Sequence, residues 1–176
     1  ADVVGARAAR CGALWEHARV APRGEGDEAL DVLSRIASLD PADGAALDGI
    51  LHLAAQPREP QPAAADGESA PRSMRSPSLL LTALAAKKEL AQGPVGRSML
   101  ETERCLLLER MGAADSSALA TALSGYRAAL ALWPESLLAA RGVERLATQL
   151  GDRAALLESQ LALAGLVLSD GERASC

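Results

Sequence analysis

The stretch YRAALALWPESLLAARGVERLATQLGD, residues 126–152, decides the fold of this 176-residue chain. It is rich in Ala and Leu, two strong helix formers. Pro134 interrupts the run, because proline cannot continue a helix but is well suited to begin one. Gly151 follows the last apolar residues, as a glycine at a helix C-cap does. The stretch therefore predicts the end of one helix, a tight corner, and a second helix over 135–150.

An earlier stretch, LSRIASLDPADGAALDGILHLAAQ at residues 33–56, repeats this pattern. When Pro41 is aligned with Pro134, residues 29–56 match 122–149 without a gap. The matched pairs are Leu33 with Tyr126, Ile36 with Ala129, and Gly49 with Gly142. Nearer the N-terminus of each copy, ARC at 9–11 aligns with ERC at 103–105 when the loop that follows differs by one residue in length. By the same alignment, Cys176 would begin a third copy. The cysteine spacing predicts a repeating unit of about 70 residues, in four helices, with an insertion in the first copy.

The rest of the chain predicts helices and no strand. Aromatic residues make up 2% of the chain and Phe is absent, which argues against a β-sandwich or barrel. Residues 57–77, PREPQPAAADGESAPRSMRSP, are too rich in proline and small polar residues to bury a core, and we interpret them as a linker or inserted loop. They separate a first set of repeats, residues 1–56, from a second set, 78–176, in one continuous array. Helices are predicted over 3–20, 28–39, 43–55, 78–92, 95–112, 116–133, 135–150 and 153–168, with Asp170 capping a ninth.

The spacing of residues in the second copy resembles the tetratricopeptide repeat (TPR). That family has a small residue, a large residue four positions on, a small residue three further on, and a proline five beyond that. The second copy matches this pattern in full. In the first copy, Ile36 occupies a position where the family usually has Ala. The glycines of both copies lie about two residues away from the glycine position of the family. The matching residues of the second copy are Ala122, Tyr126, Ala129 and Pro134. The resemblance implies an all-α, right-handed α-solenoid of stacked antiparallel helical hairpins.

The resemblance also implies a partner-binding face. In the family, the first helices of the hairpins line a concave groove that takes a peptide or helix of another protein. Some members hold a partner's terminal carboxylate with Lys and Asn, but this chain has no Asn and only Lys87 and Lys88. Arginines on first helices can take that role, and the candidate partner-binding residues are Arg7, Arg10, Arg104 and Arg141.

The sequence contains no recognisable catalytic arrangement. Cys11 and His17 are six residues apart and face away from each other on a helix, and His52 is the only other histidine. Glu101, Glu103 and Glu109 alternate with arginines, which predicts a solvated face. No nucleophile elbow, phosphate loop or zinc-protease motif occurs. We therefore expect a non-enzymatic protein that needs no cofactor or metal.

Charge and cysteine content narrow the function further. The net charge is −5 and basic residues are scattered, so we expect no nucleic-acid partner. No apolar run reaches the ~18 residues of a membrane span. Three cysteines without a CxxC pair, and no signal-peptide pattern, favour a cytoplasmic protein, and the Ala- and Arg-rich composition favours a bacterial one. The C-terminal residues DGERASC stop just after a predicted helix start, so we expect the sequence to be a fragment of a longer protein. Two alternatives to a protein-binding scaffold stay open. One is an accessory or regulatory segment of a larger enzyme or signalling protein, and the other is a helical binder of a small apolar ligand.

Overall fold

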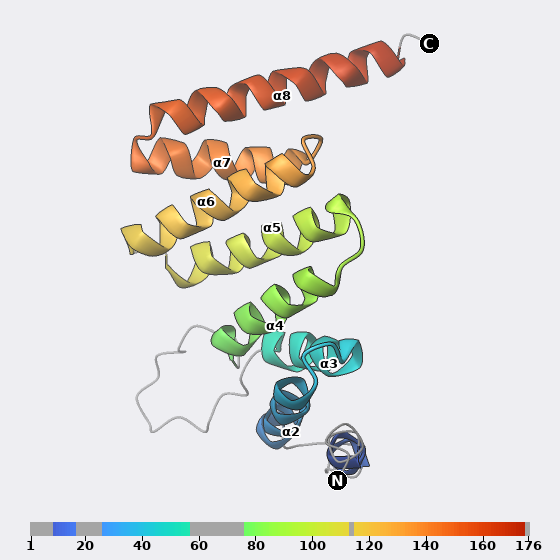
Figure 1. Cartoon of the computed structure of the whole chain (residues 1–176). Coiled ribbons are helices and arrows are strands. Elements are labelled where there is room, and N and C mark those ends of the chain that lie inside the picture. The colour runs from blue at the N-terminus through green and yellow to red at the C-terminus, as the bar shows by residue number, and fades with distance from the viewer. Residues whose placement is uncertain (1–8, 17–25, 57–75, 113–114, 175–176) are drawn as a thin grey trace. The chain divides into compact units, whose positions relative to one another are not determined.

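The described part of the chain consists of helices joined by short turns. The computed structural model describes residues 9–16, 26–56, 76–112 and 115–174, with the backbone alone over 167–174. Within these ranges no strand occurs, so the predicted all-α class is confirmed. Residues 9–16 form a helix, and seven longer helices follow (Figure 1): α2 Gly26–Leu39, α3 Gly44–Ala55, α4 Pro77–Leu90, α5 Pro94–Met111, α6 Ser116–Leu132, α7 Leu137–Leu150 and α8 Arg153–Ala174.

The predicted helix boundaries from residue 28 onward lie within two residues of those in the structure, except at the end of α8. The predicted cap at Asp170 is wrong, because α8 continues through this residue to Ala174. Gly171 follows Asp170, and an isolated glycine inside a helix costs only about 1 kcal/mol, which is too little to end it. Pro77 is the first residue of α4, the position at which a proline is well suited to begin a helix. Residues 57–75, the ends of the predicted 3–20 helix, and the expected third copy at Cys176 lie outside the described residues.

The chain forms two compact units, Ala1–Leu90 and Ala91–Cys176. In the first unit α2 packs on α3, and α3 packs on α4. The helix at 9–16 is tied to α3 by Trp15, whose indole Nε1 donates to Oδ2 of Asp43 at 3.0 Å. The other oxygen of Asp43 accepts from the N–H of Ala46 at 3.0 Å and caps α3. One carboxylate therefore begins α3 and holds the preceding helix. The buried apolar residues include Leu30, Leu33, Ile36, Leu47, Ile50, Leu80 and Leu84.

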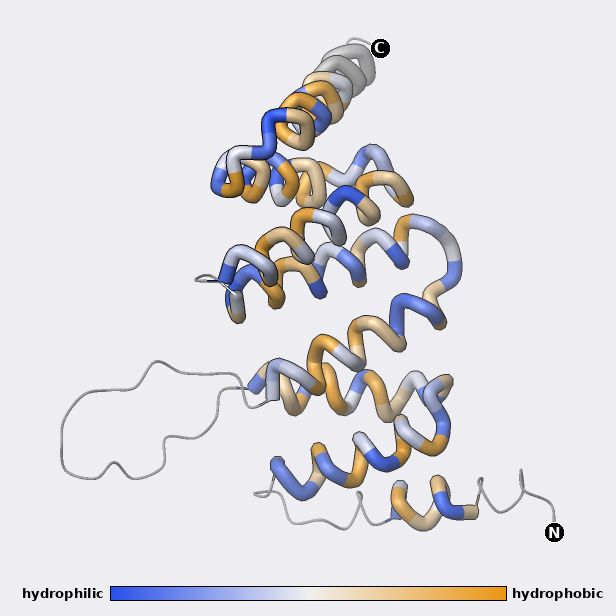
Figure 2. The backbone as a smooth tube through the Cα atoms, turned by 60° about the vertical axis from the view of Figure 1, so that its left-hand side comes forward, coloured by the Kyte–Doolittle hydropathy of each residue, from blue (hydrophilic) through white to orange (hydrophobic). Residues whose placement is uncertain are grey.

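In the second unit each helix packs on the next, from α5 to α8. The helices α5 and α6 approach closely at Gly125, where an added Cβ would lie 2.3 Å from Sγ of Cys105. One turn further along α6, the hydroxyl of Ser98 on α5 donates to the carbonyl of Ala129 at 2.7 Å. Small residues at this crossing therefore set the distance between the two helices. Figure 2 shows hydrophobic and hydrophilic positions interleaved along these helices, as expected where each helix has both buried and exposed faces.

The corner between α2 and α3 and the corner between α6 and α7 have the same construction. The last residues of α2 and α6 (39 and 132) and the first residues of α3 and α7 (44 and 137) are each 93 positions apart. Gly49 lies against the side chain of Leu33 in the first corner, and Gly142 lies against the ring of Tyr126 in the second. The pairs aligned from sequence thus make equivalent contacts.

Candidate functional site

Two of the four predicted arginines, Arg104 and Arg141, are already paired with carboxylates. Arg104, on α5, donates from Nη2 to Oε1 of Glu101 at 2.5 Å and from Nε to both carboxylate oxygens at 3.2 Å. These hydrogen bonds raise the pKa of Arg104, against the opposing effect of its burial. Arg141, on α7, is largely exposed and donates from Nη1 to Glu144 at 2.7 Å. Of these two, Arg141 alone is open enough to meet a partner.

Glu101 corrects the prediction of a solvated carboxylate face. Its side chain is only 4% exposed, because α6 has glycine at position 125 and lies directly against it. Glu109 is also engaged: it accepts from Arg145 of α7 through three hydrogen bonds of 2.7, 2.9 and 3.1 Å. Only Glu103 of the three is exposed as predicted. The burial of Glu101 and the pairing of Glu109 depend on neighbouring helices, which the alternation of charges along one helix does not predict.

Tyr126 is the largest fully buried side chain of the described residues. Burial, and then the proximity of Glu109, raise the pKa of its phenol above the usual range. Its hydroxyl nevertheless makes no hydrogen bond of ordinary geometry within the described structure. The ring, packed over Gly142, therefore acts mainly as a filling group at the α6–α7 corner.

Exposed apolar side chains lie beside Arg141. Leu137 and Leu138 in the first turn of α7 are each 57% exposed, and Leu132 at the end of α6 is 38% exposed. Helical spacing places Leu137 and Leu138 one turn before Arg141. We call Leu137, Leu138 and Arg141 the corner patch.

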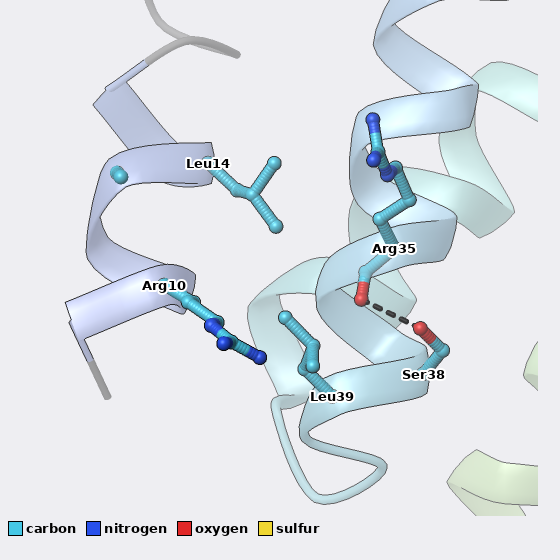
Figure 3. A pocket seen from close by; sticks show the side chains of 6 residues that line it. Arg10, Leu14, Arg35, Ser38 and Leu39 are labelled. Carbon is cyan, nitrogen blue, oxygen red and sulfur yellow. Dashed lines mark hydrogen bonds between the residues drawn. The ribbon is translucent and has the colours of Figure 1, made fainter. Parts of the chain in front are cut away.

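The remaining described arginine of the predicted set, Arg10, lines a pocket in the first unit. The pocket has a volume of about 440 Å³ and lies between the 9–16 helix and α2. Figure 3 shows Arg10 extending toward Leu39, and Leu14 projecting toward α2. The lining residues are Arg10, Ala13, Leu14, Arg35, Ser38 and Leu39.

Sequence reasoning did not select Arg35, because it considered only arginines on the first helix of each hairpin. Arg35 lies three residues before Ser38 and four before Leu39, so helical spacing puts it on the same face of α2 as these two residues. That face lines the pocket toward the 9–16 helix. Arg7, the fourth predicted residue, lies outside the described residues.

Other candidates for chemistry stay isolated. His52, on α3, is exposed and lies 3.2 Å from Nε2 of Gln56; His17 falls outside the described ranges. Cys105 is buried and Cys11 partly so. Over the described residues, no three side chains of metal-binding type come together. None of the described helices is both long and apolar enough to cross a membrane.

The fold and its sites define a class, an all-helical chain whose successive helices pack in order within each of two units. No family model matches the sequence, and no curated protein or solved structure does either.

Proposed function

We propose that the chain is a TPR-like, right-handed solenoid that binds a peptide or helix of another protein and has no catalytic activity. The repeated corner supports the proposal. The same positions bury a large side chain of one helix against a glycine of the next, as Leu33 does on Gly49 and Tyr126 on Gly142. Recurring contacts of this kind are characteristic of helical repeats that bind through an extended surface.

The corner patch supports the binding role. Leu137 and Leu138 each keep more than half of their surface in water. Arg141 adds a cationic group that is 59% exposed. Exposed leucines beside an arginine fit an amphipathic segment with acidic residues, in the manner of a helix or peptide docked in a groove. A cytoplasmic bacterial setting, without nucleic acid or cofactor, belongs to the same proposal. An accessory or regulatory segment of a larger enzyme or signalling protein remains the alternative.

A photo-crosslinking residue at position 138 of the full chain, expressed in bacterial cells, tests this proposal. We expect discrete adducts with a partner protein. The matched control is the same residue at position 157, where Leu157 on α8 is 59% exposed, close to the value for Leu138. Adducts that are absent at 138, or equal in pattern and yield at both positions, would contradict binding at the corner patch.

The pocket favours a second candidate, a binder of small molecules. Its volume of about 440 Å³ falls within the usual range for ligand sites. Native mass spectrometry of the chain purified from cells would detect a retained small molecule. A mass shift that disappears on denaturation supports this candidate.

A further inference from the structure

The pocket between the 9–16 helix and α2 combines two cationic groups with an apolar lining. Arg10 and Arg35 are both exposed, and neither forms an ion pair with any described carboxylate. Exposed guanidinium groups keep their donors free for an incoming acceptor, and their planar shape matches a carboxylate. Between them, Ala13, Leu14 and Leu39 offer aliphatic surface.

The equivalent place in the second unit is closed. The alignment of ARC with ERC pairs Arg10 with Arg104 and Ala13 with Leu107. Arg104 is neutralised by Glu101, and Leu107 is buried at 5% exposure. The alignment on Pro41 and Pro134 likewise pairs Arg35 with Ala128. An open pocket with two arginines that pair with no described carboxylate is therefore a property of the first unit and not a necessary product of this helical pairing.

The sequence strengthens the contrast at one further position. The residue of the first copy that corresponds to Glu101 is Arg7. Where the second copy supplies a carboxylate to its arginine, the first copy supplies another cation. The sequence of the first copy thus has an arginine where the second copy has the counter-ion of Arg104, in a chain whose net charge is −5.

We infer that this pocket binds an acidic segment of the partner protein, with one carboxylate side chain held by Arg10, another held by Arg35, and an aliphatic side chain between them against Ala13, Leu14 and Leu39. The inference rests on the proposed function, because it specifies the chemistry of the partner. Charge complementarity selects the acidic residue, and the aliphatic lining selects a neighbour such as leucine.

Nuclear magnetic resonance of the full ¹⁵N-labelled chain tests this, with acetyl-Glu-Leu-Glu-amide as the probe. We expect saturable shifts of the amide signals of Ala13, Leu14 and Leu39, with a dissociation constant of roughly 1 mM, as suits a short peptide. The shifts should weaken as salt rises, since exposed charges are screened. Acetyl-Gln-Leu-Gln-amide removes the charge and acetyl-Glu-Ala-Glu-amide removes the aliphatic group; each should bind roughly tenfold or more weakly.

Two variants localise the binding. Ala13→Leu places at this position the residue found in the second copy, and should fill the pocket while leaving both arginines in place. Because Ala13 is exposed, the substitution should not disturb folding. Arg35→Ala removes one cation, and Arg153→Ala is the control, at an exposed arginine of the second unit that belongs to neither proposed site. We expect both pocket variants to lose at least about tenfold in affinity and the control to bind like the parent.

The outcomes separate this inference from the proposed function. Shifts that are absent, that persist with the Gln peptide, or that survive in both pocket variants overturn the pocket assignment. If crosslinking at position 138 still yields a partner in that case, the interaction role stands and the acidic-segment site fails. If the peptide binds as expected but no partner is captured, the pocket stands and the corner patch fails.

Discussion

Gly49 and Gly142 hold the same position in two helix corners but face different neighbours. An alanine Cβ at 142 would lie 2.7 Å from three ring atoms of Tyr126, and one at 49 would lie 2.8 Å from Cδ1 of Leu33. The tyrosine ring is rigid and fully buried, whereas the methyl groups of a leucine can rotate away.

Gly142→Ala should therefore destabilise the protein by about 1–3 kcal/mol, as overpacking of a core does. Gly49→Ala should cost less than about 1 kcal/mol, because the better helix propensity of alanine offsets the adjustment of Leu33. Urea unfolding of both variants measures the difference. Equal losses would contradict the idea that the large side chain sets how closely the helices approach.

Ala129 tests the orientation of α6. It is fully buried, and the hydroxyl of Ser98 reaches its carbonyl, so Ala129→Leu should cost roughly 1–3 kcal/mol. Arg127 is half exposed and pairs with Glu158 on α8 at 2.8 Å. Because exposed ion pairs contribute little, Arg127→Ala should change the free energy of unfolding by no more than about 0.5 kcal/mol. A neutral Ala129→Leu with a damaging Arg127→Ala would mean that the helix faces the other way.

The raised pKa of Tyr126 predicts how the stability of the protein changes at alkaline pH. Its pKa is raised in the folded state, so the folded protein keeps the phenolic proton above the unfolded pKa of about 10. The contribution of Tyr126 to the free energy of unfolding is therefore fully present below pH ~10. It is lost as the pH rises further, at up to about 1.4 kcal/mol per pH unit. Because the chain has one tyrosine, its phenolate absorbance reports this group alone. We expect phenolate to form together with unfolding; a phenolate that forms near pH 10 in folded protein would contradict a buried hydroxyl.

At the scale of the helices, the sequence predicted most boundaries that depend on local chemistry. The predicted helix starts at 116 and 153 are confirmed: Asp115 and Asp152 cap α6 and α8 and accept from the backbone N–H groups of Ser117 and Ala155 at 2.9 and 3.0 Å. Gly151 has the left-handed conformation, with a φ of 73°, that its position after α7 implied. Local residues fix such features, which is why one sequence suffices to find them.

Features set by tertiary contacts could not be predicted in the same way. The burial of Glu101 depends on a glycine of another helix, and the pocket depends on Arg35 of α2 and Arg10 of the 9–16 helix lining the same space. The second arginine lies on the helix that the family resemblance does not associate with binding. The candidate site was therefore predicted only in part: Arg10 was expected, and its pocket partner was not.

The segment between α3 and α4 provides a test at this scale. The N–H of Ser76 lies 3.5 Å from the carbonyl of Ala54, so the chain leaves and returns at neighbouring points. Residues 57–75 can thus be replaced by a short Gly-Ser linker without stretching the helices. Their Pro-rich composition predicts that melting will fall by less than about 8 °C, or roughly 2 kcal/mol for a chain of this size. A larger fall in a thermal melt would indicate that the segment packs on the first unit.

The whole molecule should behave as two units, each with its own core. The core of the second unit is built from Cys105 through Ala155 and the partly buried residues beside it, all within 91–176. A fragment of residues 91–176 should therefore fold alone, with a helical circular dichroism spectrum and a cooperative urea transition. A fragment that stays unfolded, or unfolds without cooperativity, would show that its stability requires residues 1–90.

The bond from Trp15 to Asp43 has a spectroscopic consequence. The chain contains two tryptophans, and they are divided between the units: Trp15 in the first and Trp133, at the end of α6, in the second. A variant that keeps only Trp15 would report by its fluorescence when the first unit opens, since the indole would lose its carboxylate acceptor. A variant that keeps only Trp133 would report on the α6–α7 corner. The fluorescence of these two variants can thus follow the unfolding of each unit separately within an intact chain.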